Sequence, residues 1–190
     1  MKSLKIKHMV CRHCVSLVKD TLSQVPDLQL ESVHLGTVDL KKTPTAEQIK
    51  EIRTRLESQG FALIDDHRSQ LIEAVKTLII NEVHYQENQK GPQESFSEFI
   101  TRKIGYDYSY LNDLFSSAES KTIGHYLILQ KIERVKELLI YGEKSISEIA
   151  DSLEYSSAQY LSSQFKKYTG MTPGQFRKIG LKSRKSLDEV

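Results

Sequence analysis

Two cysteines three positions apart carry the clearest chemistry in this 190-residue sequence. Cys11 and Cys14 form a Cys-x-x-Cys pair and are the only cysteines in the chain. Two soft thiolates at this spacing can bind one soft ion, and two such ligands satisfy Cu(I). Zn(II) usually takes four ligands and would also need His13, His8 or a second chain. A redox dithiol and a silent pair in a docking domain are the alternatives that this spacing leaves open.

The elements around the cysteines predict a small α+β domain over residues 1–66. Leu4 and Ile6 alternate with lysines, as in a half-buried strand, and helical spacing follows the cysteine pair. The predicted elements are a strand around Leu4 and Ile6, a helix over 14–24, strands over 28–35 and 37–40, a helix opened by Thr43 and Pro44 and ended by Gly60, and a strand over 61–64. This βαββαβ order predicts a ferredoxin-like sheet with both helices on one face.

Composition and charge narrow the class of partner. The chain is 38% apolar and 27% charged, which excludes a collagen-like or wholly disordered protein. Residues 161–190 hold seven Lys and Arg against two Asp and Glu, whereas residues 67–160 are net negative. Basic charge at one end favours a polyanion over a small neutral substrate. No apolar run approaches the roughly 20 residues that span a bilayer, and Met1–Val10 does not look like a signal peptide. We therefore expect a cytoplasmic protein without a membrane partner.

The second half predicts an all-helical domain over 70–180, after a polar linker at 65–69 and before a basic, mobile tail at 181–190. Helical periodicity recurs over 71–79, 96–103, 108–117, 123–141, 146–153 and 156–168, with a polar interruption at 86–93. Tyr110, Leu111, Leu114 and Phe115 are expected on the inner side of their helix. Twice a short helix, a turn and a second helix follow one another, which predicts two helix-turn-helix units.

The distal unit shows why such helices suit a DNA groove. Its core positions are expected at Ile146, Ile149, Ala150 and Leu153, and Leu161 and Phe165 should turn inward on the second helix. That leaves Ala158, Gln159, Ser162 and Ser163 outward. Small polar groups on an outer face can enter the major groove and hydrogen bond with base edges.

Several motifs in this half resemble the AraC/XylS family of bacterial transcription regulators. They are Tyr108–Phe115, Lys131–Leu139, Ser145–Tyr155 and Tyr160–Arg177, which includes Thr169-Gly-Met-Thr-Pro-Gly174. The similarity covers roughly residues 70–178. It implies two reading helices, each for a major groove of double-stranded DNA, and a connecting helix between them. A helical bundle that binds another protein is the alternative.

The resemblance also implies which residues contact DNA. Base contacts would come from Ser109, Asn112 and Asp113 in the first unit and from Gln159, Tyr160, Ser162 and Ser163 in the second, with Gln159 suited to adenine. Phosphate contacts would come from Lys166, Lys167, Arg177 and the later Lys182, Arg184 and Lys185. The sequence departs from the family at Asp113 and Ser163, where a basic side chain is common. It departs again at Glu154, where glycine is usual, which predicts a strained or shifted turn.

The cysteine loop has a resemblance of its own. Met9-Val-Cys11-Arg-His-Cys14, between the first strand and the first helix, is similar to the Met-x-Cys-x-x-Cys loop of heavy-metal-associated domains. This similarity covers about residues 3–64 and implies binding of Cu(I) or Zn(II) by Cys11 and Cys14.

Together these features predict a sequence-specific DNA-binding transcription regulator that responds to a soft metal through its N-terminal domain. No catalytic constellation, phosphate-binding glycine loop or cofactor fingerprint is present in the sequence, so we do not expect an enzyme. RNA polymerase is a candidate partner, and a homodimer through the N-terminal domain is a candidate assembly. The alternative is a metal carrier or thiol-redox protein with a helical protein-binding domain.

Overall fold

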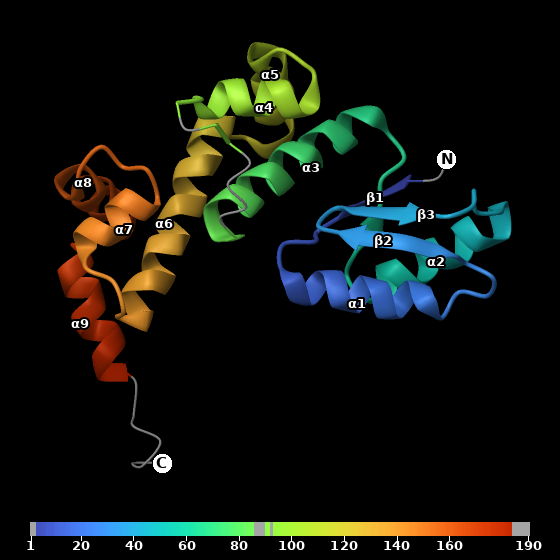
Figure 1. Cartoon of the computed structure of the whole chain (residues 1–190), viewed down its shortest axis with the longest axis horizontal. Coiled ribbons are helices and arrows are strands. Elements are labelled where there is room, and N and C mark those ends of the chain that lie inside the picture. The colour runs from blue at the N-terminus through green and yellow to red at the C-terminus, as the bar shows by residue number, and fades with distance from the viewer. Residues whose placement is uncertain (1–2, 86–89, 92, 184–190) are drawn as a thin grey trace. The chain divides into compact units, whose positions relative to one another are not determined.

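The computed structural model describes residues 3–85, 90–91 and 93–183, which form two compact units (Figure 1). The first unit comprises Met1–Glu82 with Glu87–Thr122, and the second comprises Val83–Gln86 with Ile123–Val190. The first predicted helix-turn-helix thus belongs to the same unit as the N-terminal sheet. These units do not coincide with the predicted domains, which stay predictions.

The N-terminal part of the first unit is a four-stranded antiparallel sheet with helices on one face (Figure 1). Its elements are β1 (Ser3–Lys7), α1 (Arg12–Ser23), β2 (Leu30–His34), β3 (Thr37–Leu40), α2 (Ala46–Ser58) and β4 (Ala62–Leu63). The strand order is β2-β3-β1-β4, and each neighbouring pair is antiparallel. The predicted order of elements and the α+β class are confirmed.

Alternation along the strands places the core between the sheet and the two helices. On β1, Leu4 and Ile6 are buried while their neighbours are half-exposed, because successive side chains of a strand point to opposite faces. Leu4 pairs with Val38 on β3, and Ile6 pairs with Leu63 on β4. The helices complete this core with Val18, Leu22, Ile52 and Leu56, all fully buried.

Two predicted helix starts are wrong for the same reason. The cap of α2 is Thr45, not Thr43: the Thr45 hydroxyl accepts from the Gln48 N–H, and the Gln48 side chain accepts from the Thr45 N–H. The predicted linker at 65–69 is largely helix, since the Asp66 side chain accepts from the Ser69 N–H and α3 begins at His67. Threonine and aspartate are common in loops, but here Thr45 and Asp66 cap helices.

Helices form the remainder of both units. In the first unit these are α3 (His67–Ile80), α4 (Phe96–Ile104) and α5 (Tyr108–Glu119). In the second they are α6 (Ile123–Tyr141), α7 (Ile146–Ser152), α8 (Ala158–Thr169) and α9 (Pro173–Ser183). A π-helical turn at Asn81–Tyr85 begins in the first unit and ends in the second. Residues 86–89 and 92 of the predicted polar interruption lie outside the described residues. No helix within the described ranges is long and apolar enough to span a membrane.

Helix α9 was not predicted from the sequence. It continues to Ser183, so the first three residues of the predicted mobile tail are helical, and residues 184–190 lie outside the described part. Thr172 begins the helix: its hydroxyl accepts from the Gln175 N–H, and the Gln175 side chain accepts from the Thr172 N–H. Pro173 follows in the first helical position, where a missing N–H costs nothing.

Candidate nucleic-acid interface

Helix α5 is held by α4 in a helix-turn-helix arrangement. Ser95 and Glu98 cap the start of α4 with reciprocal hydrogen bonds, and Gly105 ends it with a left-handed φ of 80°. After the turn, α5 buries Leu111 and Phe115, which are 1% and 0% exposed. The buried pair fixes which face of α5 remains in solvent.

The outer face of α5 carries the predicted base-reading residues. Ser109 and Asp113 are exposed, and Asn112 is half-buried. Tyr110 was predicted on the inner side but is 44% exposed, and its ring stacks on Tyr106 with centroids 5.6 Å apart. The predicted inner side of this helix is therefore corrected at Tyr110, which adds an aromatic group to the solvent-facing surface.

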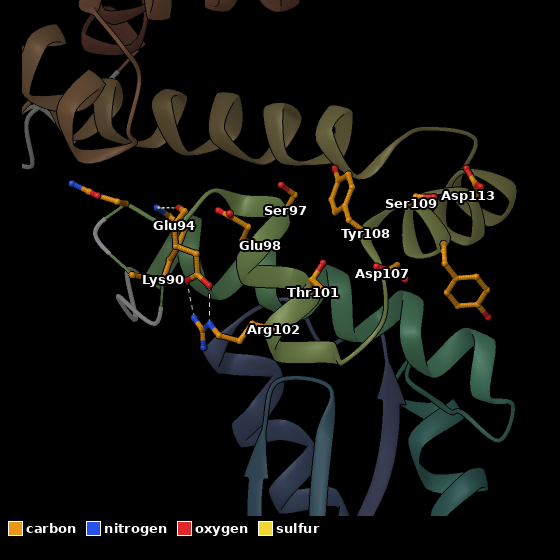
Figure 2. Close-up of a pocket in the computed structure, with 13 residues that line it drawn as sticks. Lys90, Glu94, Ser97, Glu98, Thr101, Arg102, Asp107, Tyr108, Ser109 and Asp113 are labelled. Atoms are coloured by element: carbon orange, nitrogen blue, oxygen red, sulfur yellow. Dashed lines mark hydrogen bonds and ion pairs between the residues drawn. The ribbon is translucent and has the colours of Figure 1, made fainter.

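A groove of about 1720 Å³ runs beside α4 and the beginning of α5 (Figure 2). Ser109 and Asp113 line one part of it, and residues preceding α4 line the other. Its charged lining residues are Lys90, Glu94, Glu98, Arg102, Asp107 and Asp113. Acidic groups thus outnumber basic ones, so the groove does not favour a phosphate backbone electrostatically.

The arginine in this groove is already engaged. Arg102 donates from Nε to Glu94 Oε1 at 2.7 Å and from Nη2 to Glu94 Oε2 at 2.8 Å, which is a two-pronged ion pair. The hydrogen bonds from Arg102, joined by one from the Gly91 N–H, lower the pKa of Glu94 to about 2. This pair occupies two of the five N–H donors of Arg102, and the Glu94 carboxylate offsets the charge that Arg102 could offer a phosphate.

The second unit presents α8 in a similar way. The Ser157 hydroxyl accepts from the Tyr160 N–H at the start of the helix. Leu161 and Phe165 are fully buried, and Phe165 meets Phe176 of α9 edge to face with centroids 5.5 Å apart. The predicted inward positions of α8 are confirmed, and α9 packs against the buried side of this helix.

Of the four residues predicted to face outward on α8, Gln159 and Ser163 are exposed and Ala158 and Ser162 are half-buried. Tyr160 is exposed as well. The Ser162 hydroxyl donates to the Ala158 carbonyl at 2.8 Å, and the Ser163 hydroxyl donates to the Tyr160 carbonyl at 2.9 Å. Their oxygen atoms are left as acceptors, whereas the Gln159 amide can both donate and accept.

The turn between α7 and α8 is strained at Glu154. This residue has a φ of 54°, in the left-handed region that favours glycine, so of the two predicted alternatives the strained turn is the one present. Lys131 of α6 donates to the Leu153 carbonyl at 2.6 Å, and its ammonium lies 5.3 Å from the Tyr155 ring centroid. Burial raises the pKa of Tyr155 to about 12. Lys131 therefore supports the turn that positions α8.

The predicted phosphate-binding residues differ in their surroundings. Lys166 and Lys167 are exposed in the last turn of α8. Arg177 is half-buried, and its Nη2 donates to the Lys144 carbonyl at 2.6 Å, so it holds α9 against the segment before α7. The side chain of Lys182, together with Arg184 and Lys185, lies outside the described residues. Among the predicted phosphate-binding residues whose side chains the structure describes, Lys166 and Lys167 are thus the exposed ones.

The cysteine pair sits at the start of α1. Cys11 is the N-terminal cap residue, Cys14 lies in the first turn, and their Sγ atoms are 3.3 Å apart. Both thiols are free and half-exposed. Burial by itself raises the pKa of Cys14, but hydrogen bonds from Val10 and Cys11 outweigh it and leave that pKa below its ordinary value. Neither His8 nor His13 joins the pair in a three-ligand cluster within the described part of the chain.

Sequence reasoning missed two structural supports of the α8 face. From the sequence, Lys131 was expected only as part of the connecting-helix motif, and Arg177 only as a phosphate contact. Their carbonyl acceptors, Leu153 and Lys144, are distant in sequence, so no local pattern signals these bonds. The third support, α9, has a local signal in the Thr172 and Gln175 capping pair.

Comparison with known proteins gives a family match in the helical part. Residues 100–179 match the model of a helix-turn-helix domain. A related sequence is an uncharacterised HTH-type transcriptional regulator of Pseudoalteromonas carrageenovora, 26% identical over 66% of this chain and 74% of that protein. The xylose and melibiose operon regulatory proteins of Escherichia coli K12 are 31% and 29% identical over 53% and 46% of this chain. The chain matches only 26% and 29% of the length of these two proteins.

Two solved structures share the fold of 60% of this chain. The DNA-binding domain of AdpA, in complex with a target DNA, covers 60% of this chain at a TM-score of 0.50 and 18% identity, with 95% of that domain matched. The C-terminal domain of AraT, a response regulator from Geobacillus stearothermophilus, covers 60% of this chain and 88% of that domain, with a TM-score of 0.50 and 24% identity. The related sequences are named as transcriptional regulators or operon regulatory proteins. Residues 100–179 of this chain are thus similar to the helix-turn-helix domain of transcription regulators.

Proposed function

We propose that this protein is a sequence-specific transcription regulator that reads double-stranded DNA with α5 and α8. The observation that carries this proposal is α8 itself. Its buried side holds Leu161 and Phe165, while Gln159 and Ser163 are exposed. Lys166 and Lys167, later in the same helix, are exposed as well. A capped helix with an exposed polar face is the element that enters a major groove in helix-turn-helix proteins.

Base recognition would rest on amide and hydroxyl groups. The Gln159 side chain can pair with both N6 and N7 of adenine, and a good bidentate pair contributes roughly 1–3 kcal/mol of discrimination. Tyr160, Ser162 and Ser163 would add contacts on α8, and Ser109, Asn112 and Asp113 on α5. Asp113 can accept from a cytosine amine but repels phosphate.

Backbone affinity would come mainly from α8. Lys166 and Lys167 are exposed there, whereas the groove beside α5 is lined by more acidic than basic groups and its Arg102 is paired with Glu94. Each phosphate neutralised releases counterions and contributes about 0.9 to the slope of log affinity against log salt. The α8 lysines therefore set the salt dependence, and α5 contributes chiefly to sequence choice.

A salt titration with matched variants tests these roles. A preferred DNA is first selected from a random pool with the full chain, and its affinity is measured between 50 and 300 mM salt, roughly the range in which counterion release is resolved. Lys166→Gln with Lys167→Gln should lower the slope by about 1.8. The control Lys136→Gln removes a lysine of α6 that is paired with Glu133 at 2.7 Å, and it should leave the slope unchanged.

Gln159→Ala separates base reading from backbone binding. It should weaken the selected DNA by about tenfold or more and leave both nonspecific affinity and the salt slope unchanged, because an amide releases no counterion. Absence of DNA binding even at low salt would contradict the regulator and favour the alternative, a metal carrier or thiol-redox protein.

The N-terminal domain would add a response to a soft metal. Cys11 and Cys14 are free, half-exposed and close enough to converge on one ion, and the pKa of Cys14 is lowered, which favours the thiolate that a soft metal takes. Two thiolates suit Cu(I), whereas Zn(II) would need further ligands from this or a second chain. A bound ion would supply a fixed link between the loop and α1.

The metal proposal has a direct test. Cys11→Ser with Cys14→Ser should abolish stoichiometric Cu(I) uptake and leave the DNA affinity of the metal-free protein unchanged. Retained uptake would remove the assignment. Selection of DNA with and without Cu(I) would then show whether the ion shifts a binding equilibrium.

Assembly and location follow from the proposed role. A homodimer through the N-terminal domain would double the DNA contacts, and RNA polymerase is the candidate protein partner of a promoter-bound regulator. A protein that binds chromosomal DNA in a bacterium acts in the cytoplasm, which is where we place it. Sedimentation of the full chain with and without DNA measures the stoichiometry.

A further inference from the structure

A second cavity lies in the first compact unit, and neither α5 nor the cysteine pair lines it. It has a volume of about 380 Å³ and is lined by β1, the β2–β3 turn, the start of β3, α3 and the end of α4. Small-molecule sites occupy roughly 300–1,000 Å³ and combine an apolar wall with a few convergent polar groups. The size of this cavity falls at the lower end of that range.

One boundary of the cavity is fixed by close packing. A Cβ atom built on Gly36 would lie 2.8 Å from Thr77 Oγ1, so the β2–β3 turn approaches α3 as closely as a glycine allows. Gly36 also has a φ of 71°, which the tight turn requires. This contact holds α3 near the sheet beside the cavity.

The apolar part of the lining comes mostly from helices. Leu71, Ala74 and Leu78 recur along one side of α3, and Ile104 lies at the end of α4. Leu35 adds an apolar group from the β2–β3 turn. These side chains can cover the hydrocarbon body of a small ligand.

Two lysines give the cavity a positive character. Lys5 of β1 donates to the Thr37 hydroxyl at 3.0 Å, which orients its ammonium and leaves two further N–H donors. Lys103 contributes from the last turn of α4. In the described part of the chain neither lysine forms an ion pair.

The acidic group of the lining does not offset both lysines. Glu73 accepts from Lys76 at 3.1 Å, so its charge is partly neutralised by a residue that does not line the cavity. The Nε2 atom of His67 forms a hydrogen bond with the Tyr106 hydroxyl at 3.0 Å. The charge of Lys5 acts on Asp39 as well, but Asp39 is not part of the lining.

We infer that this cavity binds a small organic acid, with its carboxylate between Lys5 and Lys103 and its apolar body against α3. The ligand would connect the sheet with α3 and α4, and α4 is the helix that holds α5. A charge-assisted hydrogen bond is the strong kind in proteins, so the carboxylate should dominate recognition.

The test uses the full chain without DNA, so its outcome is independent of the proposed DNA binding. Isothermal calorimetry is run with sodium hexanoate and with hexanamide, which has a similar chain but no charge. Hexanoate should bind saturably and at least about tenfold more tightly than hexanamide. Equal affinity for the two probes, or no binding of hexanoate, would overturn the inference.

Variants locate the binding. Lys5→Gln with Lys103→Gln should reduce hexanoate affinity to the level of hexanamide, whereas the exposed pair Lys41→Gln with Lys42→Gln should bind like the parent. Ala74→Phe should fill the cavity and prevent binding of both probes, with circular dichroism confirming that the fold is kept. Undiminished binding in the Lys5 and Lys103 variant would show that hexanoate binds elsewhere.

Discussion

Replacing Glu154 by glycine should stabilise the second compact unit. Glu154 adopts a φ of 54° directly after α7. For a residue with a Cβ atom, this left-handed conformation destabilises the folded state by roughly 1–2 kcal/mol. Glycine avoids that cost, but its greater conformational freedom in the unfolded chain lowers the free energy of unfolding by roughly 0.4–1 kcal/mol. The midpoints of these two ranges differ by about 0.8 kcal/mol, so the free energy of unfolding should rise by about that amount.

Scanning calorimetry of the full chain measures this change. For a domain of this size, 1 kcal/mol moves the melting temperature by roughly 4–8 °C, so the second unit should melt about 3–6 °C higher. Leu161→Ala identifies the relevant transition, because this residue is fully buried in the second unit and its truncation costs roughly 2–5 kcal/mol.

Glu154→Ala is the matched control. It removes the same carboxylate but keeps a Cβ atom, so the strain remains and the melting temperature should not gain as glycine does. Equal gains in the two variants would assign the effect to charge and refute the conformational explanation. A loss of stability in Glu154→Gly would refute the left-handed turn itself.

The remaining predictions concern supports away from this turn. Arg177→Met should lower the free energy of unfolding by about 1.5–3 kcal/mol in urea titrations, because the charge-assisted bond to the Lys144 carbonyl is lost. Gly36→Ala should lower the melting temperature, since φ is 71° and the new Cβ would meet Thr77 Oγ1; adding Thr77→Ala should recover only the steric part. The lowered pKa of Cys14 means that its thiolate forms at lower pH, so alkylation by iodoacetamide, followed by peptide mass spectrometry, should reach half its maximal rate below pH 9.0.

The sequence predicts those elements whose periodicity and end signals agree. The connecting helix was placed at 123–141 and is found at Ile123–Tyr141, because its apolar stripe is long and Gly142 ends it with a φ of 74°. Prediction from the sequence fails where two candidate helix caps compete. Thr43 and Thr45 both precede a helical stretch, and Thr45 is the cap because Gln48 can complete the reciprocal bonds.

The candidate site is less predictable because its electrostatics depend on tertiary contacts. The exposed positions Gln159 and Ser163 follow from helical spacing, whereas Ser109 was expected from the family resemblance. Pairing of Arg102 with Glu94 joins a helix to the segment before it, so periodicity contains no signal for it. The same holds for cavities lined by several elements, since their walls come together only in the folded chain.

The two helices proposed to read DNA, α5 and α8, present different chemistry. On α5, Asp113 is exposed beside a groove where acidic groups predominate, so approach to a phosphate backbone is opposed there. On α8, Lys166 and Lys167 are exposed and attract the same backbone. If α8 supplies most of the nonspecific attraction, α5 can add discrimination only after α8 has engaged the duplex. Removing the α8 lysines should then weaken all DNA sequences alike, whereas Asp113→Asn should strengthen nonspecific binding more than it changes sequence choice.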